Sequence, residues 1–500
     1  MPIKKAPDER QCCGLGHGEG TRGKVWFDFI DYTAVAGVHD MYRCRQRPIW
    51  FVIWLVSFAI AIGVMFVSLA LLFIEFLKYP IVTELQLTYS SDVPFPAVTI
   101  CNLNPIRMSA IQKADQYLIG MFDSDEVKQF KDKGWEAMGQ QRPQDDVEQK
   151  MKDEFVQMLY NHKANFTRYG HHLKAMLLEC RFQRESCDLR NFTKWSHPTY
   201  GNCFTFTPMQ SSFVAYVGPT HGLSVTLYAQ DDDYLPSLSS ATGFQVQVHA
   251  SEYVPFPESH GFTISPGLRS AVAVRQQFIS RQPWPWKDLA DNTKAMEGLV
   301  NYTAASCMHV CHVKMQADRC GCVDASMVTY DQMQIAHGER APKACSRQND
   351  QERKCLVAVH KDASQSDTCS KDCPQACIEV PYELQVTASL WPRDDYFKEN
   401  ADVWRTKMGN NADNSSKIAT VEQARTMLAR LEVYYQELNS QTIIESKMYT
   451  IWSLLSDIGG TIGLWCGLSM LGILQIVELI CYLLHPPRST ETQRTLSSAY

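Results

Sequence analysis

The chain has 500 residues, of which 45% are hydrophobic and 20% are charged. Its 48 basic and 54 acidic side chains leave a net charge of −6, so it lacks the surplus of positive charge that binding to nucleic-acid phosphates requires. The mean hydropathy is slightly polar, which excludes a protein built mostly of membrane helices but leaves room for a few.

The first clear feature is an uncharged apolar run at residues 49–74. Its 26 residues would extend for roughly 39 Å as a helix, enough to cross about 30 Å of hydrocarbon with some tilt. A cleaved signal peptide is a poor alternative, because the run is too long and starts too far from the terminus. The sequence therefore predicts a first membrane helix over residues 49–76, after an N-terminal segment of residues 1–48.

A second apolar segment begins near residue 448 and ends at residue 484, and its only charged residues are Asp457 and Glu478. Its length and composition predict a second membrane helix over residues 448–484. A short tail of residues 485–500 follows it. The long segment between the two helices, residues 77–447, is expected to form one large domain.

Basic residues predict the orientation of the two helices. Arg43, Arg45 and Arg47 stand just before the first helix, against Lys78 just after it. Because basic flanks stay on the cytoplasmic side, the N-terminus is predicted to be cytoplasmic. Two spans return the C-terminus to the same side, which makes residues 77–447 extracellular and places the protein in the plasma membrane.

Glycosylation sequons agree with an extracellular segment, because all four N-x-S/T sequons fall within it. They are Asn165, Asn191, Asn301 and Asn414. Thiol counts point the same way. Five of the 18 cysteines lie in the predicted cytoplasmic or membrane parts, which leaves 13 outside; the five are Cys12, Cys13, Cys44, Cys466 and Cys481.

The extracellular cysteines are densest between Cys307 and Cys377. In an oxidising compartment this density indicates a disulfide framework, and no histidine in the cluster has the spacing of a zinc finger. We therefore expect disulfides and no metal. Since 13 is an odd number, at least one extracellular thiol should be unpaired or bonded between chains.

Short stretches with alternating apolar residues predict half-buried strands in this segment. They are residues 96–101, 203–206, 223–228, 244–249 and 383–389, and a further strand is favoured over residues 430–438. Between residues 146 and 162 the apolar residues recur at helical spacing instead. The expected fold class is a membrane protein with two transmembrane helices and a large disulfide-rich α+β ectodomain.

Common catalytic motifs are absent, because the sequence has no G-x-S-x-G, no H-E-x-x-H and no P-loop. We therefore expect no catalytic residue and no cofactor. One interpretation is a two-span ectoenzyme or adhesion receptor, which has no use for carboxylates within a span. A two-span receptor gated by ATP is another, but the lysine-rich cluster that an ATP site needs is missing.

A carboxylate inside a membrane helix is costly and is retained where it faces water or a partner. From Asp457 a stripe at helical spacing leads to Glu478, 21 residues later, which is about six turns. The stripe consists of Asp457, Gly460, Leu464, Gly467, Leu471, Leu474 or Gln475, and Glu478. Several copies around an axis would place an acidic ring at each mouth of a pore, and such rings concentrate cations.

The glycines of this segment allow a second interpretation. Gly459, Gly463 and Gly467 have the spacing of a small-residue face that packs against another helix. This explains the glycines but not the carboxylates, and a narrow pore needs close helix approach as well. In Gly467-Leu468-Ser469 a glycine allows the helix to break, which exposes carbonyl groups and a serine hydroxyl to a permeant cation.

The sequence resembles the superfamily of degenerins, epithelial sodium channels and acid-sensing channels along almost the whole chain. The segments that carry the resemblance are Phe95–Asn102, Gly201–Phe206, His260–Gly267, Trp284–Trp286, the cysteines from Cys307 to Cys377, Trp391–Pro392, Asp457–Gly460 and Gly467–Ser469. The resemblance implies a homotrimeric sodium channel in the lipid bilayer, blocked by amiloride-type compounds. Its ectodomain would contain palm, β-ball, finger, thumb and knuckle regions.

The resemblance also assigns roles to residues of the second span. Gly467, Leu468 and Ser469 match the selectivity filter, and sodium is the permeant ion. The expected pore-lining residues are Ser456, Asp457, Gly460, Leu464 and Glu478. Ser456 matches the position at which bulky residues hold degenerin channels open.

The resemblance further implies a set of disulfides. The pairs are Cys101–Cys203, Cys180–Cys187, Cys307–Cys373, Cys311–Cys369, Cys320–Cys355 and Cys322–Cys345. In many relatives the counterpart of Cys377 pairs with a cysteine just after the segment Trp284–Trp286, which we call the tryptophan turn. At that place this chain has Leu289. Cys377 is therefore expected to be the thiol left over.

Gating residues follow from the same resemblance. Tyr79 is expected to stack on Trp286 and to couple the ectodomain to the pore. The alternative is that both are aromatic residues that anchor the membrane boundary. The family's His-Gly pair before the first span appears here as His39-Asp40, unusually close to that span, so we assign no gating role to this pair from the resemblance.

The stimulus that opens the channel is predicted from the ectodomain. Asp231–Asp233 resembles one half of the family's acidic pocket, but three adjacent aspartates are more typical of a solvated turn. Direct proton gating is therefore disfavoured, and a proton-gated or constitutively open member remains the alternative. We favour an extracellular FMRFamide-type peptide, which is cationic and aromatic. Its expected contacts, which could equally be packing residues, are Phe122, Phe130, Met151, Phe155 and Tyr160, near acidic residues such as Asp123 and Asp125.

Overall fold

The structure is a computed structural model. It describes residue 41 and residues 43–89, 91–112, 156–157, 160, 166–208, 213–234, 239–287, 302–328, 342–346, 349–365, 368–409 and 418–484. The chain divides into two compact units. One comprises Met1–Val82 with Lys447–Tyr500, and the other is Thr83–Ser446. The two expected membrane helices fall in the first unit, and the expected ectodomain lies almost entirely in the second.

The first unit contains a short 3-10 helix, η1 (Cys44–Gln46), and the long helix α3 (Pro48–Leu77). A proline at its first position suits a helix start, because the amide that proline lacks would have no partner there. At 30 residues, α3 is the one helix among the described residues that is by itself long and apolar enough to cross a membrane. It covers the expected span of residues 49–76 with one more residue at each end.

The second expected span is broken. It consists of α17 (Ile451–Cys466) and α18 (Met470–Leu484), and the helix axes bend by 72° at the break. Only the two pieces taken together are long and apolar enough to cross a membrane. The segment predicted as the second span, residues 448–484, thus contains two helices, and the break lies at Gly467–Ser469, where the sequence analysis allowed for one. Gly467 adopts a left-handed conformation with φ of 68°, which ends the first helix.

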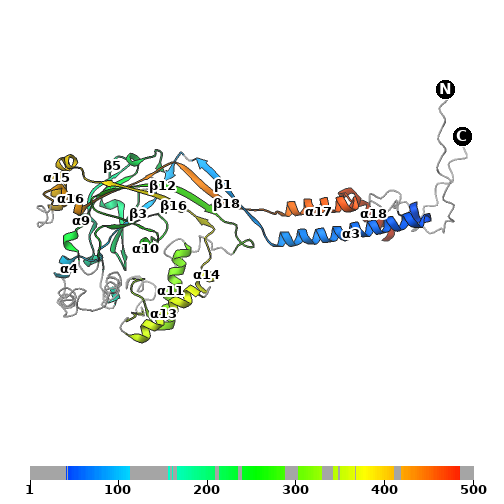
Figure 1. The fold of residues 1–500 in the computed structure, drawn as a ribbon, viewed down its shortest axis with the longest axis horizontal. Coiled ribbons are helices and arrows are strands. Elements are labelled where there is room, and N and C mark those ends of the chain that lie inside the picture. The colour runs from blue at the N-terminus through cyan, green and yellow to red at the C-terminus, as the bar shows by residue number, and fades with distance from the viewer. Residues whose placement is uncertain are drawn as a thin grey trace, which may run out of the picture. The chain divides into compact units, whose positions relative to one another are not determined.

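Helices α3 and α17 pack side by side (Figure 1). Leu454 and Cys466 are the buried residues of α17, and the Cys466 sulfur lies 3.2 Å from the Met65 sulfur of α3. On α3 the half-buried residues recur at helical spacing, as in Trp54, Phe58 and Met65. Each helix therefore buries one stripe against the other and leaves the rest of its surface exposed.

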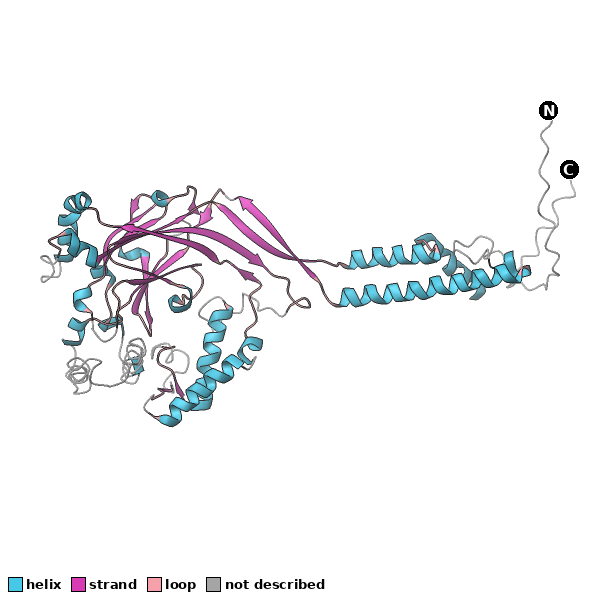
Figure 2. Cartoon of the chain, viewed as in Figure 1, coloured by secondary structure: helices cyan, strands magenta, loops and turns pink. Residues whose placement is uncertain are grey.

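The second unit is built on a large sheet (Figure 2). Its strand order is β1-β18-β12-β17-β9-β4-β5, with parallel and antiparallel pairs. Two more strands, β15 and β16, also pair with β12. The bounds are β1 (Ile81–Tyr89), β4 (Leu177–Phe182), β5 (Glu185–Ser186), β9 (Leu223–Tyr228), β12 (Leu268–Ser280), β15 (Ile378–Glu379), β16 (Tyr382–Leu390), β17 (Leu428–Tyr435) and β18 (Asn439–Lys447). Strand β12 thus has four neighbours, β16 and β17 along its first part and β15 and β18 along its last.

A second sheet of five strands has the order β11-β10-β3-β7-β6. Its strands are β3 (Ala97–Asn102), β6 (Phe192–His197), β7 (Gly201–Phe206), β10 (Phe244–His249) and β11 (Phe262–Ile264). Side chains of both sheets meet in one buried cluster, to which β3 contributes Ile100, β10 contributes Val246 and β12 contributes Val272. The two sheets therefore share a hydrophobic core, which is the main source of stability for this unit.

A second buried cluster surrounds α15 (Asp394–Gly409) and α16 (Val421–Met427). At its centre Trp404 is fully buried, and its indole nitrogen donates a hydrogen bond of 2.8 Å to Glu179 on β4. Its ring also lies against that of Trp391, with 5.4 Å between the centroids. This packing fastens the two helices to the edge of the large sheet.

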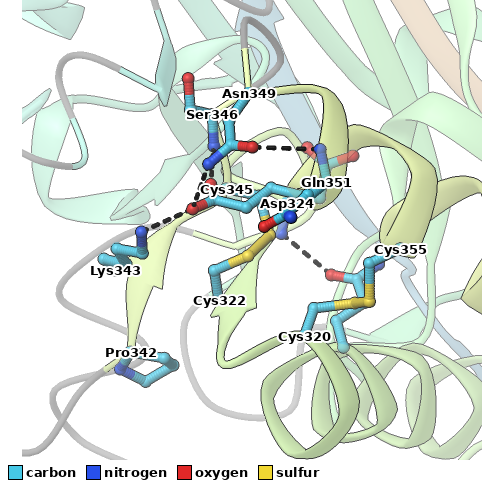
Figure 3. The surroundings of a disulfide bond; sticks show 12 residues. Cys320, Cys322, Asp324, Pro342, Lys343, Cys345, Ser346, Asn349, Gln351 and Cys355 are labelled. Atoms are coloured by element: carbon cyan, nitrogen blue, oxygen red, sulfur yellow. Dashed lines mark hydrogen bonds and ion pairs between the residues drawn. A yellow bond between two sulfur atoms is a disulfide. The ribbon is translucent and has the colours of Figure 1, made fainter.

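Disulfides stabilise a helical region made of α11 (Ala304–Cys320), α13 (Asp350–Gln365) and α14 (Thr368–Asp372). Cys307–Cys373 and Cys311–Cys369 join α11 to the segment around α14, and Cys320–Cys355 joins α11 to α13. Figure 3 shows this last bond beside Cys322–Cys345, which links the short strands β13 (Cys322–Val323) and β14 (Lys343–Ala344). Glu352 of α13 completes this corner by accepting from Lys343 and from the Ser346 amide, both at 2.6 Å.

Two further disulfides, Cys101–Cys203 and Cys180–Cys187, lie in the sheets. These six bonds are the same six pairs that the family resemblance implies. Among the described cysteines, Cys44, Cys377, Cys466 and Cys481 are free.

The remaining elements are short. They are β2 (Val93–Pro94), β8 (Phe213–Val214), α4 (Met108–Gln112), α8 (Phe166–Tyr169), α9 (Leu173–Met176), α10 (Pro257–His260), η3 (Leu189–Asn191), η4 (Pro219–His221) and η5 (Asp231–Asp233). All six strands expected from alternation are confirmed, with boundary shifts of a few residues, as β3, β7, β9, β10, β16 and β17. Most of the expected helix near residues 146–162 lies outside the described residues.

Gly201, at the start of β7, shows why glycine opens this motif. Its φ is 68°, and an added Cβ would lie only 2.2 Å from the Pro105 carbonyl oxygen. Gly321, at the end of α11, has nearly the same φ of 66° but open space around it. We expect Gly321→Ala to cost roughly 1–2 kcal/mol from backbone strain. Gly201→Ala should cost clearly more, because the Pro105 backbone must also move.

The comparison is made by thermal unfolding of the two purified variants in detergent. Equal melting temperatures would contradict the steric explanation for Gly201.

Candidate ion pathway

The broken helix α17–α18 follows directly from the large sheet, since β18 ends at Lys447 and α17 begins at Ile451. Thr450 caps the start of α17, because its hydroxyl oxygen accepts a hydrogen bond of 3.1 Å from the Ser453 amide. A three-residue link therefore connects a strand of the ectodomain to the helix that carries the predicted pore residues.

The predicted lining residues of α17 lie on the side that α3 leaves uncovered. Ser456, Asp457, Gly460 and Leu464 are all exposed, and Leu464 is 79% exposed. An added Cβ at Gly460 would meet no atom within 4 Å. The part of the stripe on α17 is therefore exposed along this helix and is not covered by the described residues.

Asp457 has a partner that the sequence analysis did not find. The Tyr449 hydroxyl donates a hydrogen bond to the Asp457 carboxylate. The Tyr449 ring also lies 6.2 Å from that of Phe76 at the end of α3, which in turn lies 6.2 Å from Tyr79. Tyr449 lies before the helix, in the link between β18 and α17, so helical spacing from Asp457 does not reveal it.

The Gly467–Ser469 segment ends one helix and starts another. The Gly467 amide donates to the Gly463 carbonyl at 2.9 Å and completes the last turn of α17. The Ser469 hydroxyl then accepts from the Gly472 amide at 3.2 Å, which is the pattern of a helix N-cap. Non-helical backbone at membrane depth is tolerated only where it is covered by protein or lines water.

Glu478 lies on α18, beyond the break, where it is exposed. The sequence analysis placed Asp457 and Glu478 on one face by counting turns along a single helix. That inference was wrong, because the break and the 72° bend separate the two residues into different helices. A common face for the two carboxylates therefore does not follow from their spacing.

The two predicted coupling residues lie in different units of the chain. Tyr79 belongs to the first unit and has a positive φ of 49°. Trp286 belongs to the second, where its amide donates to the Pro283 carbonyl at 3.2 Å within a tight turn. Stacking between Tyr79 and Trp286 stays a prediction.

The three aspartates of η5 hold local structure together. Asp233 accepts hydrogen bonds from the amide and the hydroxyl of Ser109, both at 2.7 Å. Asp232 accepts from the Tyr228 hydroxyl at 2.9 Å. Burial raises the pKa of Tyr228 above its ordinary value, and the neighbouring Asp232 charge raises it further. These contacts give the aspartates a structural role in a turn.

Four of the five expected peptide contacts lie outside the described residues. They are Phe122, Phe130, Met151 and Phe155. Tyr160 is described and only 3% exposed, and its hydroxyl donates to the Pro342 carbonyl at 2.9 Å. Tyr160 packs in an apolar cluster with Val313 and Val323. The expectation that Tyr160 contacts a ligand is therefore not met in this structure, because its ring fills a core.

Of the four sequons, Asn191 is described, and Asn165, Asn301 and Asn414 lie outside the described residues. The Asn191 side-chain oxygen accepts from the Asp188 amide at 3.0 Å. Within the described part of the chain, no group of three or more histidine, cysteine, aspartate or glutamate side chains has a geometry that could hold a metal ion.

A family model described as amiloride-sensitive sodium channel matches residues 29–479. The chain belongs to this family. As a member of the amiloride-sensitive sodium channel family it is a sodium-type ion channel and not an enzyme, in keeping with the superfamily resemblance of its motifs. Family members are oligomeric channels of lipid bilayers.

Relatives of this channel come from several branches of the superfamily. The epithelial sodium channel subunit alpha of Rattus norvegicus is 26% identical, over 91% of this chain and 74% of its own length. Acid-sensing ion channel 1C of Danio rerio is 27% identical, over 90% and 82%. Degenerin-like protein unc-105 of Caenorhabditis elegans is 31% identical, over 63% and 35%.

Among solved structures, a proton-activated chloride channel aligns at 7% identity with a TM-score of 0.30, over 87% of this chain and 97% of that one. That score is too low to support an argument.

The first test of the ion pathway is Asp457→Asn. An opposite charge at about 4 Å in water attracts a cation by about 1 kcal/mol, so its loss should lower conductance or cation preference about fivefold. Single-channel recording and reversal potentials measure both quantities. Asp395→Asn on α15 is the control, because that carboxylate is exposed and far along the chain from the pore helix. Unchanged permeation in Asp457→Asn would contradict a pore-facing carboxylate.

The second test is Ser456→Cys followed by a bulky cationic methanethiosulfonate. Because Ser456 lies on the uncovered side of α17, the adduct should keep neighbouring helices apart and produce a sustained sodium current. A whole-cell current that reverses on reduction of the adduct is the expected result. Wild type treated in the same way controls for native thiols, and no current increase in the variant would count against the pore assignment.

Proposed function

We propose that three copies of this chain form a sodium-selective channel of the plasma membrane, which opens when an extracellular FMRFamide-type peptide binds and is blocked by amiloride. In this proposal both termini are cytoplasmic, α3 is the first span and the α17–α18 pair is the second. The observation that carries the proposal is the polar stripe of α17, which the rest of the chain leaves uncovered.

The contrast between the two helices supports a pore at α17. The exposed residues of α3 are mainly large and apolar, such as Val52, Phe66 and Leu71, and suit contact with lipid. The uncovered side of α17 presents Ser456 and Asp457 as well as apolar residues such as Leu464. A carboxylate facing lipid would be costly, so this side is expected to face water or another copy of the chain.

The break at Gly467–Ser469 supports a filter at that depth. A helix interruption leaves backbone oxygens outside the helical ladder, and such oxygens can replace part of the hydration shell of a cation. Ser469 caps α18 through one oxygen lone pair, so its hydroxyl proton and second lone pair are still available. Selectivity for sodium rests on this segment and on the family to which the chain belongs.

Gating by a peptide is favoured over gating by protons for a physical reason. The aspartates of η5, which resemble part of an acidic pocket, accept hydrogen bonds from Ser109 and Tyr228 and serve a structural turn. The segment with Phe122 and Phe130 combines aromatic side chains with acidic ones, which is the composition that a cationic aromatic peptide needs.

Voltage clamp of oocytes that express the chain tests the proposal. FMRFamide should evoke an inward current in sodium solution, which disappears when sodium is replaced by a large organic cation and which amiloride blocks. A current evoked by acid instead would replace the peptide by protons, and a standing current blocked by amiloride would indicate a constitutively open channel. Silence under all conditions, and also after the Ser456→Cys adduct forms, would overturn the channel proposal.

A further inference from the structure

Arg281 and Gln282, which directly follow β12, form hydrogen bonds to two different parts of the chain. The Arg281 amide donates to the Cys377 carbonyl at 2.8 Å, and its guanidinium donates to the Ala376 carbonyl and to Glu379, both at 3.0 Å. Arg281 thereby holds the chain that leaves the disulfide-linked helices. The next residue, Gln282, makes its bonds to β18 instead.

Glu445 of β18 receives bonds from both ends of the tryptophan turn. The Gln282 amide donates to the Glu445 carboxylate at 3.3 Å, and the Gln282 side chain donates to the Glu445 backbone carbonyl at 2.7 Å. At the other end of the turn, the Lys287 ammonium lies 2.5 Å from the same carboxylate. We call Gln282, Lys287 and Glu445 the Glu445 cluster.

The cluster is largely shielded from water. The side chain of Glu445 is 11% exposed and that of Lys287 is 36% exposed. A carboxylate in such a place depends on its partners, because loss of one partner leaves a buried charge uncompensated. The Glu445 cluster is therefore a fixed connection, unlike an exposed ion pair of the same length such as Lys354–Asp350, whose side chains are 74% and 55% exposed.

The cluster lies just before the pore helix in the chain. β12 and β18 run parallel, and Ser280 pairs with Ile444, so Glu445 continues the register directly. β18 ends two residues later at Lys447, and α17 begins at Ile451. A displacement of the tryptophan turn would therefore be transmitted to the strand that leads into the pore helix.

We propose that Lys287 and Glu445 are gating residues of this channel, which position the tryptophan turn on β18 so that movement of the turn biases opening of α17. The proposal rests on the proposed channel function and adds a connection within the ectodomain. In this arrangement the turn acts on the pore helix through its own chain, in addition to any contact that Trp286 makes with Tyr79.

The test uses the Ser456→Cys channel, because its rate of modification by a cationic methanethiosulfonate reports how often the outer pore opens and requires no known agonist. Lys287→Met should change this rate about fivefold or more, the lower end of typical coupling between sites. Lys287→Arg keeps the positive charge, so its modification rate should stay within about twofold of the rate of the Ser456→Cys parent, below the range of typical coupling between sites. Lys354→Met is the matched control and should leave the rate unchanged.

The double variant Lys287→Glu/Glu445→Lys reverses the ion pair. On a logarithmic scale, its modification rate should recover at least about half of the difference between Lys287→Met and the parent. A role in folding alone would lower surface delivery and leave the modification rate of delivered channels unaltered, so surface biotinylation is measured in parallel. If Lys287→Met folds poorly, Glu445→Gln in the same background serves as the second disruption.

The outcomes separate the two proposals. Full modified current with an unchanged rate in Lys287→Met and Glu445→Gln would overturn the role of the Glu445 cluster while leaving the channel intact. A changed rate that charge reversal does not restore would also overturn it. Absence of any modified current in the Ser456→Cys parent would overturn the channel function itself.

Discussion

A polar side chain on a membrane helix must meet water or another polar group. This requirement limits what the exposed side of α17 can face. α3 covers only one side of α17, and the side that carries Ser456 and Asp457 is exposed with respect to the part of the chain that the structure describes. Tyr449 supplies one hydrogen bond to Asp457, but a single hydroxyl does not replace the hydration of a carboxylate. In the proposed assembly a wet passage between several copies would meet the remaining demand, so assembly and conduction would have the same physical cause.

The ectodomain is stabilised in a way that suits transmission of small movements. Its two sheets share one buried core, and disulfides join α11 to α13 and to the segment around α14. Protein interiors of this kind transmit displacement because they are close-packed. The link from sheet to pore is short, since three residues separate β18 from α17. The chain therefore leaves only three residues between the sheet and the helix that is proposed to line the pore.

Much of this fold could be predicted from sequence because its signals are local. Alternation in residues 244–249 predicts β10, and an uncharged run predicts α3, since each depends on a period within one element. Contacts between distant residues have no such signal. Glu445 and Lys287 are 158 residues apart, and no period relates Tyr449 to Asp457. Tyr160 illustrates the converse error, because an aromatic residue near acidic ones suits a binding cleft and a core equally well until its burial is known. The glycine of Gly467-Leu468-Ser469 indicates that a helix can break there, but the 72° angle of the bend has no signal in the sequence.

Strand β12 carries a consequence for the mechanics of the ectodomain. It pairs with β16 and β17 along its first part and with β15 and β18 along its last, so one inextensible backbone of 13 residues spans both halves of the sheet. An extended strand cannot lengthen appreciably, because its bond lengths and angles are fixed. An axial shift imposed where β12 meets β16 is therefore expected to reappear at Ser280, which pairs with Ile444 of β18, the strand that precedes α17.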